Sequence, residues 1–132
     1  MNSNFTKPRG IAKASTALLL LLIGGSSWAA GDLANGKLQY EQKCSGCHAI
    51  DAHRAGPAHR GIFGRKAGSA AGFSYSTALK NSSVIWNEKT LEAWLSEPER
   101  LIPGQAMYFQ VNDAASRRDI IAYLATHKPN GK

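Results

Sequence analysis

Five consecutive residues, Cys44-Ser45-Gly46-Cys47-His48, have the types and the spacing that could do chemistry in this chain. The spacing C-x-x-C-H is that of a covalent attachment site for a c-type haem. The two thiols, which are the only cysteines of the chain, can form thioethers to the two vinyl groups of one haem. The histidine can then ligate the iron through an imidazole nitrogen. The motif therefore predicts a protein that holds one iron and passes electrons through it.

The same residues have other chemical uses, which the spacing alone leaves open. A C-x-x-C pair in an exported protein can form a disulfide, or act as a thiol redox motif on a thioredoxin-like fold. Two cysteines cannot make a four-ligand structural zinc site by themselves, but His48, His53 and His59 could complete one. Features elsewhere in the chain are needed to distinguish haem attachment from these other uses.

A second ligand to the iron is predicted at Met107. Since Met1 belongs to a predicted signal peptide, Met107 is the only methionine of the mature chain, and it lies in a loop with Pro103 and Gly104. A lone methionine more often fills a core, but a loop position together with the haem motif favours ligation. A thioether is a soft ligand that favours ferrous iron and raises the redox potential.

The remaining histidines are the alternatives to a methionine ligand. His53 follows His48 by five residues and should lie on the same side of the ring, and His127 ends the last predicted helix and should meet solvent. His59 follows a Gly-Pro-Ala segment and is expected near the haem, also on the His48 side. A bis-histidine site is therefore the weaker alternative.

Residues 1–29 have the pattern of a secretory signal peptide, with a basic start, a short apolar run and small residues before the cut. The apolar run centres on residues 18–23 and is shorter than the about 20 residues that cross a bilayer. Ser27 and Ala29 stand at the −3 and −1 positions of a cut after Ala29, and the bulky Trp28 excludes a cut one residue later. An uncleaved membrane anchor is the alternative.

Removing residues 1–29 leaves one small domain, residues 30–132, of 103 residues. The removed segment carries 3 of the 16 basic residues and none of the 9 acidic ones, so the formal charge falls from +7 to +4. This scattered, mildly basic charge argues against a nucleic-acid-binding protein and is compatible with a basic face for an acidic redox partner. Because a domain of this size buries only a thin core, we expect it to fold poorly without haem.

Helix signals at both ends of this domain predict a mostly α-helical fold. A first helix starts near Asp32 and runs into the C-x-x-C-H motif. A last helix starts at Asn112 or Asp113, carries an apolar stripe, and ends at Lys128-Pro129. Gly36 lowers helix stability, so its place within the first helix indicates a close approach to another backbone, predicted to be that of the last helix.

The middle of the domain is predicted to be rich in loops, because glycines punctuate residues 54–72 and no alternating strand pattern of useful length occurs. A short helix is expected over residues 74–80. Another helix is expected to begin at Asn87 and to stop at Pro98, and residues 102–110 form a loop.

Beyond the C-x-x-C-H motif, an ordered set of short motifs follows along the chain. They are Gly56-Pro57, Gly61-Ile62-Phe63-Gly64-Arg65-Lys66-Ala67-Gly68, Gly72-Phe73-Ser74-Tyr75-Ser76, Val84-Ile85-Trp86, Thr90-Leu91 and Ile102-Pro103-Gly104-Gln105-Ala106-Met107-Tyr108-Phe109. With this set the chain resembles the class I cytochrome c family, and its mitochondrial-type branch in particular, over nearly all of the mature domain. The resemblance implies an all-α class I cytochrome c fold, in which the first and last helices pack together and loops and short helices surround one haem.

The resemblance also implies roles for single residues. The carbonyl of Pro57 would accept a hydrogen bond from the His48 imidazole. Arg65, Tyr75 and Trp86 would donate to the haem propionates, which their guanidinium, phenol and indole groups can do. His53 would be a structural histidine that bonds a nearby loop. Gly36 and Tyr40 would contact the last helix at Tyr123 and Leu124.

Several residues depart from the branch's usual pattern. Trp94 replaces a tyrosine that bonds the methionine sulfur, and His59 replaces a leucine that packs against the haem. Leu79 replaces a polar residue near an internal water, and Gln105 replaces a threonine near a propionate. The ring of lysines around the exposed haem edge is thinned, since Glu99 and Ala106 interrupt it while Lys43 and Arg100 remain basic. The resemblance therefore carries over the fold and the haem site but not the partner.

The implied function is that of a monomeric periplasmic electron carrier with one haem c, bound through Cys44 and Cys47 and ligated by His48 and Met107, and with no catalytic residue. Its partners would be an oxidase, a membrane cytochrome complex or a periplasmic oxidoreductase, in respiration, photosynthesis or a specialised oxidation, and no stable membrane span would remain after cleavage. Two alternatives stay open: a haem enzyme or gas sensor with a labile methionine ligand, and a membrane-anchored cytochrome c.

Overall fold

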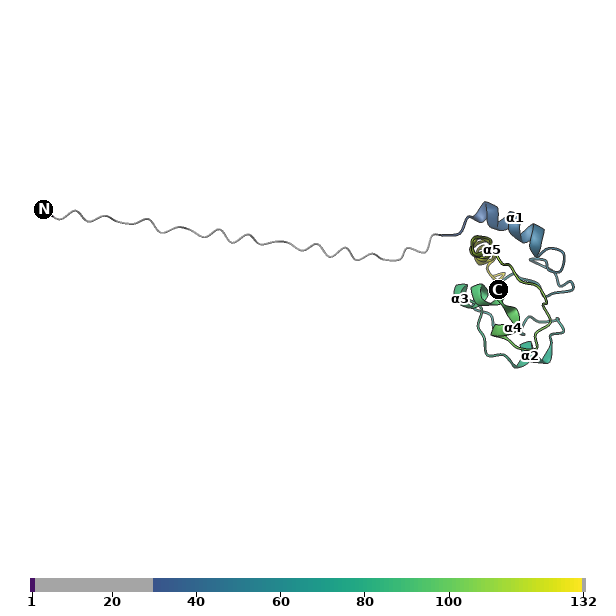
Figure 1. Cartoon of the computed structure of the whole chain (residues 1–132). Coiled ribbons are helices and arrows are strands. Elements are labelled where there is room, and N and C mark those ends of the chain that lie inside the picture. Colours follow the sequence, from purple (N-terminus) through teal and green to yellow (C-terminus); the bar gives the residue numbers. More distant parts are fainter. Residues whose placement is uncertain (2–29, 132) are drawn as a thin grey trace.

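The computed structural model describes Met1 and residues 30–131, and the predicted signal peptide otherwise lies outside the described residues. Over residues 30–131 the chain forms five α-helices and no β-strand (Figure 1). None of these helices has the length and the apolar character needed to cross a membrane. The helices are α1 (Leu33–Lys43), α2 (Thr77–Asn81), α3 (Glu88–Ser96), α4 (Pro98–Leu101) and α5 (Ala114–Thr126).

The first and last helices start where their capping residues predict. The Asp32 side chain accepts a hydrogen bond from the backbone of Asn35, and the Asp113 side chain accepts one from the backbone of Ser116. Both bonds satisfy a backbone N–H that has no partner inside the helix. Helix α5 ends at Thr126, slightly before the predicted end.

Helices α1 and α5 lie against each other, as the glycine within the first helix predicts (Figure 1). A Cβ atom on Gly36 would stand 2.1 Å from the carbonyl oxygen of Asp119, so only a residue without a side chain permits this approach. One turn further along α1, the ring of Tyr40 packs on that of Tyr123, with centroids 5.4 Å apart. The predicted contact between the two helices is therefore confirmed.

A buried carboxylate strengthens the same helix pair. The Asp119 side chain accepts hydrogen bonds from the backbone N–H of Asp32 at 2.9 Å and from the side-chain amide of Asn35 at 2.6 Å. On the other side of α5, Arg117 donates to Glu92 of α3 at 2.6 Å and to the carbonyl of Val111 at 2.7 Å. Both polar clusters tie α5 to segments far away in the sequence.

The middle of the chain is mostly loop, as predicted, with one additional helix. Asn87 caps α3 in a reciprocal capping box with Thr90. Pro98 ends α3 as predicted, but it also occupies the first position of α4, a short helix for which no prediction was made. Proline is favoured at that position because the missing N–H would have no partner within the helix.

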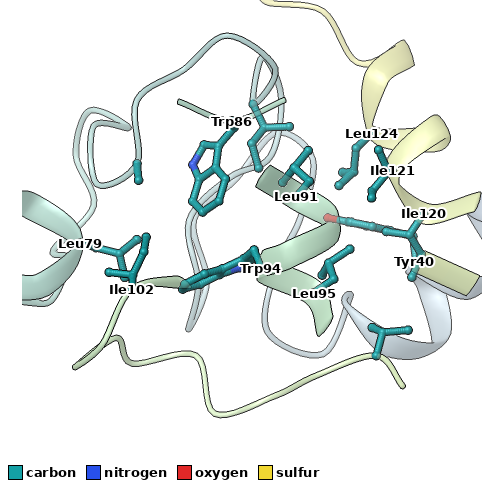
Figure 2. Close-up of a cluster of buried hydrophobic side chains, with 13 residues drawn as sticks. Tyr40, Leu79, Trp86, Leu91, Trp94, Leu95, Ile102, Ile120, Ile121 and Leu124 are labelled. Carbon is teal, nitrogen blue, oxygen red and sulfur yellow. The ribbon is translucent and has the colours of Figure 1, made fainter. Parts of the chain in front are cut away.

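The buried apolar residues form one cluster that spans the helix pair and the loops. Figure 2 shows Tyr40, Ile120, Ile121 and Leu124 on one side of the cluster, and Trp86, Trp94, Leu79 and Ile102 on the other. Leu91 and Leu95 of α3 lie between the two groups. The core is therefore continuous from the helix pair to the two indole rings.

Replacing Gly36 by alanine tests the contact that joins the two ends of the domain. In an unconstrained helix alanine is the better residue, but here the added methyl group collides with a carbonyl, so we expect the free energy of unfolding to fall by about 1–3 kcal/mol. Denaturant unfolding of the haem-loaded protein measures it. The control is Gly46→Ala, whose Cβ would meet no atom within 4 Å. Equal stability of the two variants would contradict the proposed tight contact.

Candidate cofactor site

A cavity of about 540 Å³ lies between the apolar cluster and the loops. This volume falls in the range of small-molecule and cofactor pockets. The residues that line it come from the C-x-x-C-H motif, from the loops between α1 and α3, from α3 itself, and from the loop after α4. All four residues predicted to attach or ligate the haem line this one cavity: Cys44, Cys47, His48 and Met107.

The end of α1 places the two cysteines at the cavity. The backbone N–H groups of Cys47 and His48 both donate to the carbonyl of Cys44, at 3.1 and 2.9 Å, so the motif forms a tight turn directly after the helix. Cys44 and Cys47 form no disulfide with each other, and burial raises the pKa of the Cys44 thiol to about 11. Within residues 30–131, no three His, Cys, Asp or Glu side chains come together in a group that could hold a metal ion.

His48 is held from two directions. Its Nδ1 lies 2.9 Å from the carbonyl oxygen of Pro57, as the resemblance predicts. A Cβ atom on Gly56 would stand 2.1 Å from Cε1 of His48, so the backbone presses directly on the ring. Burial lowers the pKa of His48, and the bond to Pro57 opposes that shift. A neutral ring that donates through Nδ1 keeps Nε2 free to ligate a metal.

Met107 is half-buried and is held through its backbone rather than its side chain. The side-chain oxygen of Gln105 accepts a short hydrogen bond from the Met107 N–H. The Gln105 amide also donates to Glu99 at 3.4 Å, and Glu99 accepts from the Gly104 N–H at 2.8 Å. The resemblance predicts a place near a propionate for Gln105, but this buried side chain braces the methionine loop and does not line the cavity. A glutamine two residues before the predicted methionine ligand was the sequence feature that could have indicated this hydrogen bond to the Met107 backbone.

Arg65 and Trp86 are brought to the cavity wall by the only β-type pairing of residues 30–131, an isolated bridge between Lys66 and Ile85. Arg65 donates to the carbonyls of Ala58 at 2.9 Å and Arg60 at 3.1 Å, which fix its guanidinium. Burial lowers the pKa of Arg65.

Tyr75 also lines the cavity, and it packs edge-on against Phe73 with ring centroids 4.8 Å apart. The three residues predicted to donate to propionates, Arg65, Tyr75 and Trp86, therefore share this cavity. Together they place a guanidinium, a phenol and an indole N–H on the wall of an otherwise largely apolar space.

The other histidines take structural positions. His53 accepts from the Ala58 N–H at 2.9 Å and bonds the carbonyl of Ala71 at 2.8 Å, so it joins two loops as predicted. His127 is half-buried and bonds the carbonyl of Tyr123, whereas the sequence analysis expected it to meet solvent. The ring of His59 stacks on that of His48, with centroids 4.2 Å apart and planes 21° apart. Two imidazoles on opposite sides of one iron would lie end to end, so this stacking argues against a bis-histidine site.

Comparison with known proteins identifies the family. A family model of cytochrome c matches residues 33–128. This chain belongs to the cytochrome c family. Its relatives include cytochrome c of Nigella damascena, 41% identical over 99 residues that cover 72% of this chain and 89% of that protein. Cytochrome c type-1 of Ascaris suum is 43% identical over 97 residues, which cover 71% of this chain and 87% of the relative.

A solved structure is similar as well. Cytochrome cH from Methylobacterium extorquens matches with a TM-score of 0.69 and 39% sequence identity, covering 73% of this chain and 99% of that structure. Family membership confirms the predicted class I fold, the covalent haem c and electron transfer on that haem. It also confirms the prediction that the chain is an electron carrier and not an enzyme, and that it acts with redox partner proteins.

Three of this cytochrome's departures from the mitochondrial pattern lie in the cavity wall, namely His59, Leu79 and Trp94. Trp94 and Leu79 are both buried and both line the cavity. The Trp94 ring packs against that of Trp86, with centroids 5.4 Å apart. Both side chains have a large apolar surface, so the part of the wall that they form suits an apolar group.

Proposed function

We propose that this cytochrome carries one electron on a haem with His48 and Met107 as axial ligands. The observation that carries the proposal is the shared cavity, because a single apolar space is lined by both candidate ligands and by the two attachment cysteines. A histidine and a methionine make a low-spin, six-coordinate iron with a raised potential. When bound, the haem supplies the redox chemistry by alternating between ferric and ferrous iron.

The chain's own residues keep the ligands in place while the charge of the iron changes. Pro57 and Gly56 hold the His48 ring, and Gln105 holds the backbone of Met107. Little movement of the ligands means little reorganisation on electron transfer, which favours rapid exchange with a partner. The apolar wall excludes water and supports the more weakly charged ferrous form.

Arg65, Tyr75 and Trp86 are proposed to bind the propionates. Each contributes an N–H or O–H donor on the cavity wall, and a donor to a carboxylate makes a strong, charge-assisted bond. The Arg65 guanidinium has five N–H donors and uses two nitrogens on backbone carbonyls, so it retains donors for a further acceptor. This arrangement would fix the haem in its plane.

Replacing Met107 by alanine tests the ligation. The wild-type ferric protein should be low-spin without added ligand, and the variant should become high-spin and bind added imidazole, because one coordination position is open. Absorption and electron paramagnetic resonance spectra measure the change. The control is His53→Ala, which removes a structural histidine and should leave the iron low-spin.

Two results of that experiment would speak against the assignment. An unchanged spectrum of the alanine variant would show that Met107 is not a ligand. A wild-type ferric protein that is already five-coordinate and reacts rapidly with peroxide would favour the haem enzyme or gas sensor. Trp94 is the feature that raises this alternative, because it replaces the tyrosine that bonds the methionine sulfur in the mitochondrial-type branch.

We further propose that residues 1–29 are a signal peptide cleaved after Ala29, and that residues 30–132 act as the haem domain in the periplasm. The sequence pattern of basic start, short apolar run and small residues supports this. The exported protein should then begin at Ala30 and carry the additional mass of one haem, which intact mass spectrometry measures. A chain that begins at Met1 in the membrane fraction would support an anchor instead.

Redox partners are proposed to dock where Tyr108 and Phe109 line the cavity and reach the surface, with exposed fractions of 89% and 47%. The charges beside them are already engaged, since Glu97 pairs with Arg100 and Glu99 bonds the Gly104 backbone. An apolar contact at this edge suits the small, weak interfaces of electron-transfer encounters. An oxidase, a membrane cytochrome complex or a periplasmic oxidoreductase are the proposed partners.

The docking edge can be tested by electron self-exchange between two copies of this protein. Tyr108→Asp should slow the exchange by about tenfold, because a charge in the contact has to be desolvated. Leu33→Asp is the matched control, since it changes the net charge equally at another exposed apolar residue, outside the cavity. Line broadening in nuclear magnetic resonance spectra of mixed redox states measures both rates, and equal rates would contradict this edge.

A further inference from the structure

Two polar residues of this chain form a pair directly behind the proposed axial histidine. The phenol oxygen of Tyr40 lies 3.1 Å from Nδ1 of His59. The His59 ring also stacks on that of His48, with centroids 4.2 Å apart. Tyr40 is only 4% exposed and belongs to α1, whereas His59 belongs to the loop after the C-x-x-C-H motif. The pair therefore connects the helix to the wall of the cavity.

The pair is joined by a hydrogen bond, since the phenol oxygen and Nδ1 lie at hydrogen-bond distance and one of the two groups donates to the other. The Tyr40 ring is itself held by its packing on Tyr123 in the contact between α1 and α5. The hydrogen bond therefore limits the rotation of the His59 ring.

The rotation of the His59 ring limits that of His48. Stacked rings 4.2 Å apart are in contact across their faces, so a turn of one ring requires the other to move. Pro57 holds one nitrogen of His48 but allows some rotation about that hydrogen bond. The His59 ring, when its own plane is fixed, prevents this remaining rotation of the His48 ring.

The pair is also continuous with the contact between α1 and α5. Tyr40 packs on Tyr123 with ring centroids 5.4 Å apart, and Tyr123 packs edge-on against His127 at 4.6 Å. Tyr40 does not line the cavity, whereas His59 does. His59 therefore connects the Tyr40 phenol to the cavity wall.

We propose that Tyr40 and His59 are a matched pair of positioning residues that fixes the plane of the His48 imidazole and couples it to the α1–α5 contact. This inference rests on the proposed function, because it takes His48 as the axial ligand. A matched pair differs from two independent packing residues in one respect. Removing either partner leaves a buried polar group unpaired, whereas removing both restores a consistent apolar contact.

The test uses the haem-loaded protein with Tyr40→Phe, His59→Leu and the double variant. Chemical shifts of the haem methyl groups in the ferric protein report the plane of the axial imidazole. Both single variants should shift these resonances. Each single variant should raise the unfolding equilibrium constant by about tenfold, and the double variant by clearly less than the product of the two.

The matched control is Tyr123→Phe. It removes a phenol oxygen from the same aromatic cluster, and that oxygen makes no hydrogen bond to any of residues 30–131. Its haem methyl shifts should equal those of the wild type.

Unchanged methyl shifts in both single variants, or additive changes in unfolding energy, overturn the proposed pair while leaving the ligation intact. A wild-type protein that is not low-spin, by contrast, contradicts the axial ligation itself. The two failures are therefore distinguishable.

Discussion

The contact between α1 and α5 at Gly36 is the constraint on which the rest of the structure depends. The C-x-x-C-H turn begins where α1 ends, so the position of α1 decides where the cysteines and His48 stand. Helix α5 in turn is tied to α3 by Arg117 and Glu92, and α3 supplies Trp94 to the opposite wall. A shift of α1 on α5 would therefore change the width of the cavity.

Buried polar groups in this small domain have hydrogen-bond partners, which matters because an unpaired one lowers stability by an amount comparable to a sizeable part of the net free energy of unfolding. Asp119 receives two N–H donors from the start of α1, and no buried side-chain nitrogen or oxygen of the described residues lacks a partner. These bonds are directional, whereas apolar packing is not. They consequently fix the rotation and register of the helices, and the apolar cluster supplies most of the favourable energy.

The sequence predicted features that depend on local chemistry or on the motif set. Asp32, Asn87 and Asp113 were recognisable as helix caps because capping acts within four residues. Gly36 was recognisable as a close helix–helix contact, because glycine destabilises a helix unless another backbone packs against it. Asp119 was not predicted, since its partners lie 84 and 87 residues away and nothing near it signals them.

The bond between Tyr40 and His59 was missed for the same reason, because their elements meet only in the folded chain. Helix α4 was missed because a proline that ends one helix was not considered as the start of the next. Sequence patterns describe what each segment prefers, and they specify long-range polar pairs only when both partners belong to a known motif.

The two proposed axial ligands are held in different ways. On one side, His48 contacts the Pro57 carbonyl, the Gly56 backbone and the His59 ring, so the side chain itself is held by three neighbours. On the other side, Gln105 holds the backbone of Met107, and no hydrogen bond to a described residue is made by the sulfur. Side-chain rotation about a fixed backbone needs less rearrangement than displacement of a packed ring. In the proposed site, His48 is therefore the more rigid ligand, and differences in redox potential and ligand exchange among variants should arise mainly at Met107.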